Sequence, residues 1–478
     1  MLPKRYFFVD RLKKNETIGH SINYLINSLS RKGLRIISIP VYTYLLTPSD
    51  YGVLNIFGSL TDLFAVLLTL NCTVGVGRYY FEKEQEDFGS LIFTSMIVVF
   101  GLLGLSWFGL TYFSNYFGKL LDVPTKTIIF IVPCVVLIVM SNYILSIFRA
   151  SKQSKIIRNY GIQQTYAMFG LSVILMLLLK EDRYMGRIWA NAIIAAVFAW
   201  IAFRKIGPLI QFHFKRKHIR YLLVYSVPLL PAYLSNMILS YFDRIMINSY
   251  LGSADAGLYS FAYNIAGLQY MFSNAFMNAW VPNYFEHINS GDHKKHDDEA
   301  KSLMRIISFI SIGLILFGDW LGKLLSSKGY HSGLELIPLV VLGQFFVSYT
   351  VMYKNGISYE KRTWISTVVI VIATVLNIWL NSIFIPQYGI IAAAYTTLAS
   401  YLVQALLTVL SVQWLLRVHT IHPIKLMGPV ILVCGATAVY YVMNQYDLAT
   451  WQDVLIKVAL AGLSGYALLK NELKKLIK

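Results

Sequence analysis

Apolar residues dominate this sequence in continuous runs, separated by short polar or charged segments. The runs have about the 20 residues that an α-helix needs to cross the hydrocarbon core of a bilayer. They are continuous rather than alternating, which argues against a membrane β-barrel. The pattern predicts an all-α polytopic membrane protein with about fourteen transmembrane helices. We expect these helices at residues 20–46, 52–77, 89–112, 127–149, 158–179, 185–203, 221–249, 256–282, 302–325, 334–354, 363–385, 389–415, 424–443 and 452–470.

The composition agrees with this prediction. Of 478 residues, 56% are hydrophobic and 14% are charged, and the mean hydropathy is +0.56. Soluble domains carry about 25% charged residues. Residues 1–19 are basic and polar without a short apolar core, so we expect no cleavable signal peptide. The three cysteines, Cys72, Cys134 and Cys434, lie in apolar runs without metal-ligand spacing, and we interpret them as packing residues.

The formal net charge of +18 would suggest a nucleic-acid partner in a soluble protein. Here the Lys and Arg residues gather in the N-terminus, in alternate predicted loops and in the C-terminal tail. With an even number of spans these segments fall on one side, and the positive-inside rule places that side and both termini in the cytoplasm. The loops are short, so the sequence leaves little room for a soluble domain or an extramembrane active site.

A repeated pattern divides the chain into two halves. Segments 44–82 and 250–286 both begin with Tyr-Leu, pass through a small acidic turn closed by Gly52 or Gly257, continue as an apolar span and end in Tyr-Phe-Glu. The offset equals six predicted spans, so the halves should be parallel, as in several transporter folds. We expect two pseudo-symmetric six-helix lobes around a central cleft, with a further C-terminal helix pair. The predicted boundaries are 1–212, 213–418 and 419–478.

The first predicted span holds Arg31, Lys32 and Arg35 far from either end. Each cationic side chain near the bilayer centre costs roughly 2.5–3.5 kcal/mol, so three would cost roughly 8–10 kcal/mol if additive. Such charges are tolerated where they face a hydrated cavity or an anionic partner. The two arginines lie in one polar stripe at helical spacing. The stripe consists of Tyr24, Ser28, Arg31, Arg35, Ser38 and Tyr42.

A stripe of hydroxyl and guanidinium groups suits oxygen-rich anions, because Arg binds phosphate through two parallel hydrogen bonds. We therefore predict that an anion passes this stripe. An alternative is that the span begins near Leu34 and that residues 20–33 form an interfacial helix whose cations bind lipid headgroups. The remaining segment, 34–46, would then be too short to cross the membrane.

Four other charged positions are candidates for function. Asp62 lies near the middle of the second span, where it can be a counterion to the basic stripe or a protonatable coupling site. Asp243 is a second ion-coupling candidate, and its neighbour Arg244 is the second lobe's candidate for the anion path. Arg78 lies at the predicted cytoplasmic end, where it can contact an anionic headgroup or anchor the topology.

Polar residues elsewhere give weaker signals. Amide side chains within the spans can line a sugar-binding cavity or hold helices together, and the sequence does not discriminate. They are Gln163, Gln164, Gln344, Asn377, Asn381 and Gln404. A cluster of His, Asp and Glu at residues 287–299 lies in a predicted cytoplasmic loop, and we interpret it as a solvated loop rather than a metal site. The sequence has no phosphate-binding Gly-rich loop and no nucleophile elbow, so we predict no cofactor and no enzymatic activity.

Several motifs resemble those of the polysaccharide-biosynthesis (Wzx-type) flippases, in the multidrug/oligosaccharidyl-lipid/polysaccharide transporter superfamily. The likeness extends over nearly the whole chain. The motifs are Leu45-Leu46-Thr47-Pro48-Ser49-Asp50-Tyr51-Gly52, Arg78-Tyr79-Tyr80-Phe81-Glu82, Asp243-Arg244-Ile245-Met246, Tyr250-Leu251-Gly252 with Gly257-Leu258-Tyr259, and Ile385-Pro386-Gln387-Tyr388-Gly389.

The resemblance implies a two-lobed, MATE-like fold with alternating access in a bacterial inner membrane. The implied substrate is a polyprenyl (undecaprenyl) diphosphate-linked oligosaccharide, flipped to the outer leaflet for O-antigen, capsule or another surface polymer. The implied substrate-binding residues are Arg31, Lys32, Arg35 and Arg244, and Arg78 is a further substrate-binding candidate because of its position at the predicted cytoplasmic end. The resemblance also implies that the last two helices form a groove for the lipid tail. Transport would be driven by an H⁺ or Na⁺ gradient, the membrane potential or substrate flux.

Three other functions compete with this prediction. A drug/cation antiporter of the same fold would favour acidic cavity residues, whereas the first span here is cationic. A polysaccharide polymerase or ligase would need a large outer loop with catalytic residues, which the predicted loops are too short to provide. A scaffold without transport activity would leave the charges within the spans unexplained.

Overall fold

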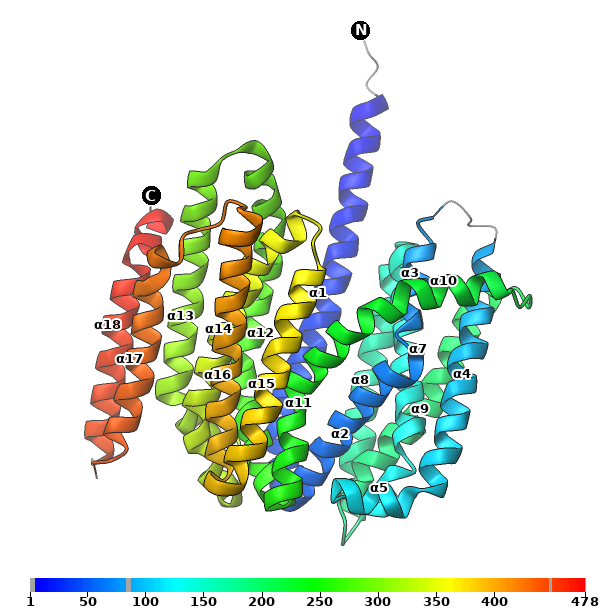
Figure 1. The fold of residues 1–478 in the computed structure, drawn as a ribbon, viewed down its shortest axis with the longest axis horizontal. Coiled ribbons are helices and arrows are strands. Elements are labelled where there is room, and N and C mark those ends of the chain that lie inside the picture. The colour runs from blue at the N-terminus through cyan, green and yellow to red at the C-terminus, as the bar shows by residue number, and fades with distance from the viewer. Residues whose placement is uncertain (1–4, 83–86, 447–448, 478) are drawn as a thin grey trace. The chain divides into compact units, whose positions relative to one another are not determined.

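The computed structural model describes residues 5–82, 87–446 and 449–477, and within these ranges it contains helices and turns but no strand (Figure 1). The predicted all-α fold is therefore confirmed. The chain divides into two compact units, Met1–Leu234 (unit 1) and Ser235–Lys478 (unit 2), and each unit is described by itself.

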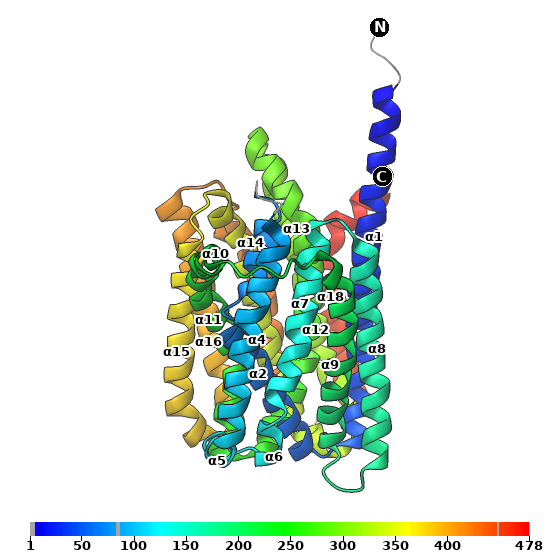
Figure 2. The ribbon, with the colours of Figure 1, turned by 90° about the vertical axis from the view of Figure 1, so that its right-hand side faces the viewer.

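Unit 1 consists of a long first helix, several membrane-length helices and shorter connecting helices. They are α1 (Arg5–Leu45), α2 (Pro48–Thr69), α3 (Cys72–Tyr79), α4 (Phe88–Tyr112), α5 (Ser114–Leu121), α6 (Thr125–Ile128), α7 (Ile131–Ala150), α8 (Ser154–Leu178), α9 (Tyr184–Ile206), α10 (Arg216–Ser226) and the start of α11 (Leu230–Leu251). Within this unit α1 lies along α8, and α7 packs against α2, α3 and α9 (Figures 1 and 2).

Unit 2 contains the rest of α11 and the helices that follow. They are α12 (Ser253–Ser290), α13 (His293–Leu324), α14 (Ile337–Tyr359), α15 (Trp364–Tyr388), α16 (Ile390–Leu410), α17 (Met427–Met443) and α18 (Thr450–Ile477). A 3₁₀ segment precedes α14, and a π-helical turn follows α16. Helices α12, α14 and α16 pack side by side, while α17 and α18 pack on α13.

The chain is a multi-pass membrane protein. Each predicted span coincides with one or more of these helices. By length and composition, twelve helical segments in the described ranges could cross a membrane. Helices α1 and α12 have the length but are not among these twelve, so the count of fourteen spans stays a prediction.

Two predicted spans are divided by turns several residues inside their ends. The span at 52–77 breaks between α2 and α3 because Leu70 and Asn71 both adopt left-handed backbone angles. The matching segment of the repeat, α12, runs unbroken. The span at 221–249 divides into α10 and α11 at a 3₁₀ turn, Val227–Leu229. Pro228 lies in this turn and cannot donate a helical hydrogen bond.

The family-like motifs around residues 47–52, 250–259 and 385–389 are helix boundaries. Thr47 and Asp50 form a reciprocal capping box at the start of α2, with Pro48 in its first turn. Gly252 (φ 97°) connects α11 to α12, and Gly389 (φ 70°) connects α15 to α16. A side chain at either glycine would be strained, so these motifs specify turns.

The segment that precedes α10 is fixed on α4. The Asp87 carboxylate, just before α4, binds the ammonium groups of Lys215 and Lys217. The Ser90 hydroxyl donates to the carbonyl of His213 at 2.6 Å. A Cβ atom at Gly89 would lie 2.4 Å from the carbonyl oxygen of Leu209, so only glycine permits this close approach. These contacts hold residues 209–217 in unit 1.

A buried ion-pair cluster fixes α18 to α13 in unit 2. The Lys457 ammonium lies 3.0 Å from Asp319 Oδ2 and 3.1 Å from Asp453 Oδ2, and the Lys457 side chain is 2% exposed. The rings of Trp320 and Tyr440 lie within 5.4 Å of the same nitrogen. The sequence analysis did not single out these residues, although the spacing of Asp453 and Lys457 is one helical turn.

We expect Lys457→Met to lower the free energy of unfolding by about 3–5 kcal/mol, because it leaves the half-buried carboxylates of Asp319 and Asp453 without their buried counterion. Thermal or denaturant unfolding of the purified protein in detergent measures this change. Lys470→Met is the matched control, because Lys470 is an exposed lysine on the same helix. An equal loss in both variants would contradict a structural role for the cluster.

The contacts of Asp87 predict a pH dependence. Hydrogen bonds from Lys215 and Lys217 lower the pKa of Asp87 to about 2, whereas an unfolded Asp titrates near about 4. The stabilising contribution of Asp87 is therefore complete above pH ~4 and lost as the pH falls towards 2. The stability difference between the wild type and Asp87→Asn should shrink over this interval in pH-dependent unfolding. If the stability difference between the wild type and Asp87→Asn grows as the pH falls, the ionised Asp87 carboxylate does not stabilise the fold.

Candidate functional site

The first helix is fixed in unit 1 by polar contacts at both ends of its membrane-length part. The Asn23 side chain donates to Ser154 Oγ at 2.9 Å and accepts from Arg158 at 2.7 Å. Towards the other end, the Tyr42 hydroxyl lies 2.9 Å from Ser172 Oγ. All three partners are on α8. These contacts determine which face of α1 is buried, and they leave the opposite side of the helix uncovered in this unit.

Arg31 and Arg35 are exposed, and Lys32 is half-buried. Apolar side chains also lie exposed on α1, including Leu29 at 60% and Ile37 at 57%. Each of these apolar residues lies two positions from an arginine, which corresponds to about 200° around the helix axis. The basic face and the exposed apolar face are therefore different sides of the helix. A lipid-facing apolar side and a separate basic side fit a helix that borders a hydrated space.

The predicted polar stripe is only partly available to a ligand. Tyr42 is buried against α8, and the Arg187 guanidinium lies 4.4 Å from the centre of its ring. The Ser38 hydroxyl donates to the carbonyl of Arg35 at 2.7 Å. Tyr24 lies under the guanidinium of Arg149 at 6.0 Å. The two arginines in the middle of the stripe remain its exposed part.

The other candidates in unit 1 have different surroundings. Asp62 is half-buried on α2. Arg78 lies at the end of α3, where it pairs with Glu82 at 3.3 Å and its guanidinium lies 6.0 Å from the Tyr225 ring. The Arg78 side chain is 59% exposed, and an exposed pair of this kind contributes about 0–1 kcal/mol. These contacts are compatible with a topology anchor as well as with an entrance for an anion.

Asp243 and Arg244 in unit 2 are both buried, at 1% and 5% exposure. The Asp243 carboxylate accepts the Tyr259 hydroxyl and the Arg244 backbone N–H. The Arg244 guanidinium lies 4.7 Å from the ring centre of Tyr263 and 5.2 Å from that of Tyr241. The two side chains therefore contact different partners. Arg244 is enclosed in aromatic rings in this structure, a favourable cation–π environment.

Hydroxyl and amide groups extend this cluster through unit 2. The hydroxyls of Tyr263 and Tyr401 are 2.8 Å apart, and Gln344 donates to the Tyr263 hydroxyl at 3.0 Å. Asn381 donates to Asn377 at 3.1 Å. The bonds of Tyr263 connect α12 with α14 and α16, whereas the two asparagines both lie on α15. The buried Gln344 therefore holds helices together rather than lining an open cavity. Sequence analysis missed these tyrosines, because the chain has 33 tyrosines and the sequence does not separate the buried ones from the exposed ones.

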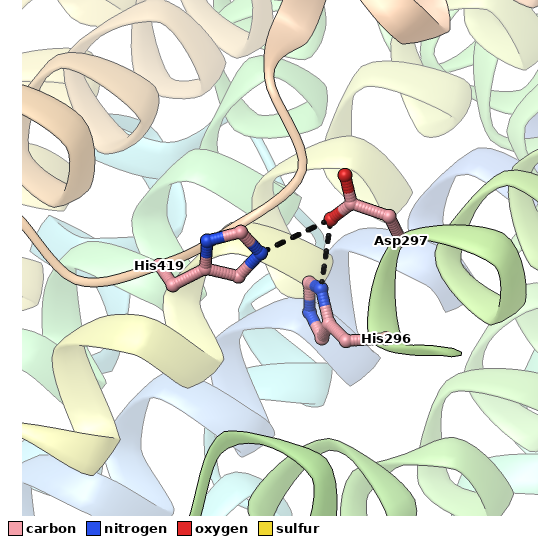
Figure 3. A group of neighbouring side chains, drawn as sticks. All are labelled: His296, Asp297 and His419. Carbon is pink, nitrogen blue, oxygen red and sulfur yellow. Dashed lines mark hydrogen bonds and ion pairs between the residues drawn. The ribbon is translucent and has the colours of Figure 1, made fainter. Parts of the chain in front are cut away.

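The cluster at residues 287–299 is not a solvated loop, and that interpretation is wrong. Helix α12 extends to Ser290 and α13 begins at His293, so the segment is mostly helical. Asp297 Oδ1 lies 3.1 Å from His296 Nδ1 and 3.3 Å from His419 Nε2 (Figure 3). These three residue types can bind a metal ion. However, Lys425 Nζ contacts the other Asp297 oxygen at 2.6 Å and supplies a counterion.

The chain is similar to known membrane proteins and to two protein-family models. A family model described as "Polysaccharide biosynthesis protein" matches residues 20–289, and one described as "MatE" matches residues 228–383. An uncharacterized membrane protein of Haemophilus influenzae is 22% identical over 79% of this chain and 94% of that protein. A protein of Haloferax volcanii described as "Probable flippase AglR" is 26% identical over 49% of this chain and 50% of that protein.

Solved structures show the same fold. The lipid II flippase MurJ, in an inward closed conformation, matches with a TM-score of 0.72 at 15% identity, covering 95% of this chain and 100% of that chain. At this identity the likeness concerns the fold alone.

Proposed function

This chain belongs to the family of polysaccharide biosynthesis proteins in the MOP superfamily, and we propose that it flips a polyprenyl diphosphate-linked oligosaccharide from the cytoplasmic to the outer leaflet. The lipid is of the undecaprenyl type, and the glycan feeds a surface polysaccharide such as O-antigen or capsule. The protein works by alternating access in the inner membrane, with both termini in the cytoplasm. It acts as a transporter rather than an enzyme.

The observation that supports this substrate class is the exposed basic face of α1. A diphosphate is the part of the substrate that is most costly to move through a bilayer, because it carries concentrated negative charge. Arg31 and Arg35 are exposed one helical turn apart, so both can bind phosphate oxygens, and Lys32 lies beside them. The lipid tail can remain in the membrane while the charged and sugar-bearing part crosses.

The other four charged candidates have different roles in this proposal. Arg78 is exposed near the end predicted to be cytoplasmic and contributes to attraction of the headgroup. Arg244 is enclosed by tyrosines, so it binds substrate only in a conformation in which these rings separate. Asp62, which is half-buried, is the better coupling site for H⁺ or Na⁺. Asp243 already has two hydrogen-bond donors and serves unit 2 structurally.

A second candidate function is drug/cation antiport, which the match to the MatE model favours. This match covers residues 228–383 and thus excludes α1. A cationic drug would be repelled by the exposed Arg31 and Arg35. We therefore favour the anionic lipid as substrate.

We expect Arg31→Ala/Arg35→Ala to reduce substrate flipping by at least about 100-fold, because two charge-assisted hydrogen bonds are lost. The measurement is surface glycan in a flippase-deficient host, with the protein level quantified in the membrane. Arg31→Lys/Arg35→Lys keeps the charge without the bidentate geometry and should give an intermediate level.

Arg204→Ala/Lys205→Ala is the matched control, because it removes the same charge from an exposed end of α9. It should display normal glycan. Normal glycan in the Arg31→Ala/Arg35→Ala variant at a normal protein level would contradict the proposed anion path. Drug resistance conferred by the wild-type protein, without glycan display, would favour antiport.

We expect Asp62→Asn to abolish the dependence of transport on a pH or Na⁺ gradient in proteoliposomes, because the variant cannot exchange a proton or bind a cation. Asp243→Asn is the comparison: it should lower the amount of folded protein but leave the gradient dependence of the remaining activity. If transport by Asp62→Asn still depends on the gradient and transport by Asp243→Asn no longer does, then Asp243 is the coupling residue and Asp62 is structural.

A further inference from the structure

A basic groove in unit 2 lies where α13, α17 and α18 meet, and its volume is about 240 Å³. Lys301 and Arg305 reach it from α13, and Lys425 reaches it from the 3₁₀ segment before α17. No Asp or Glu lines this groove in the part of the chain that the structure describes. The groove therefore gathers three cationic side chains, and the carboxylates that pair with two of them lie outside its wall: Asp298 is 3.9 Å from Lys301, and Asp297 is 2.6 Å from Lys425.

The position of Lys425 is fixed by the cluster in Figure 3. Its ammonium binds one oxygen of Asp297 at 2.6 Å, and the other oxygen lies within 3.3 Å of nitrogens of His296 and His419. Asp297 is buried, and half of the Lys425 side chain remains exposed. The cluster thus holds a cation at the groove while leaving part of its surface accessible.

The other wall of the groove is apolar. Leu432 of α17 and Leu468 of α18 line it. Gly428 also lines it, in the first turn of α17, which continues directly from the 3₁₀ segment. Exposed apolar residues continue beside the groove, with Ile424 at 72% on the 3₁₀ segment and Ile431 at 60% on α17. A ligand that fits both walls has an anionic head and an apolar chain.

We propose that this groove binds the phosphate of an anionic membrane phospholipid, whose acyl chains lie along α17 and α18. The volume admits a headgroup but not a complete lipid, so the chains extend over the exposed apolar surface. Basic pockets between transmembrane helices on the cytoplasmic side bind such headgroups, and the predicted topology places this end of α13 there. The proposal does not depend on the proposed function.

The test is native mass spectrometry of the purified full-length protein, titrated with phosphatidylglycerol or phosphatidylcholine. We expect the wild type to retain phosphatidylglycerol. The Lys301→Ala/Arg305→Ala variant should retain it roughly 10- to 30-fold more weakly, since each of the two removed cations attracts the anionic headgroup. Lys294→Ala/Lys295→Ala is the matched control, because these two exposed lysines precede the groove on the same helix.

Three outcomes would overturn the proposal. Equal weakening in the control pair would mean unspecific attraction between a basic protein and an acidic lipid. Equal retention of phosphatidylcholine and phosphatidylglycerol would mean that the net negative charge of the headgroup does not contribute to binding. Displacement of phosphatidylglycerol by equimolar inorganic phosphate would mean that the groove takes a free anion rather than a lipid.

A second variant keeps the test informative if the double variant does not fold. Leu432→Trp narrows the groove and preserves all three cations, so it should also weaken retention of phosphatidylglycerol. Thermal unfolding in detergent without added lipid verifies that each variant is folded. Retention at the wild-type level in a folded Leu432→Trp variant would contradict binding inside the groove.

Discussion

The cost of placing a charge in apolar surroundings, several kcal/mol for each buried ion, is the constraint on which the described structure depends. The chain meets this cost in three ways. Lys457 is neutralised by two carboxylates within 3.1 Å. Arg244 is covered by tyrosine rings, while Asp243 accepts a tyrosine hydroxyl. Arg31 and Arg35 are not buried in this way, and they keep an exposed face.

These differences separate structural charges from charges that can bind a ligand. A cation that already has two carboxylate partners gains little from a further anion, because its counterions must first be displaced. Arg31 and Arg35 are exposed on a helix with a separate apolar face, so an anion can approach both guanidinium groups. The proposed substrate contacts therefore lie on α1, and the buried clusters of unit 2 hold its helices together.

The beginning of α13 combines both kinds of charge. His296 and Asp297 are buried where the sequence indicates only a polar segment, and Asp297 positions Lys425 from a distant part of the chain. A solvated loop cannot fix a cation in this manner, because its side chains would exchange partners with water. Burial of the carboxylate converts a local group of charges into a defined basic groove beside α17 and α18.

The sequence by itself determined the all-α membrane architecture, the approximate helices and the family, because continuous apolar runs and turn motifs are local features. Thr47, Gly252 and Gly389 specify helix boundaries through capping or positive backbone angles, whatever surrounds them. Only the tertiary structure decided how each charge is satisfied. Asp319, which pairs with Lys457, and Asp297, which pairs with Lys425, lie more than a hundred residues away along the chain, and no periodicity along the chain encodes which faces of two helices meet.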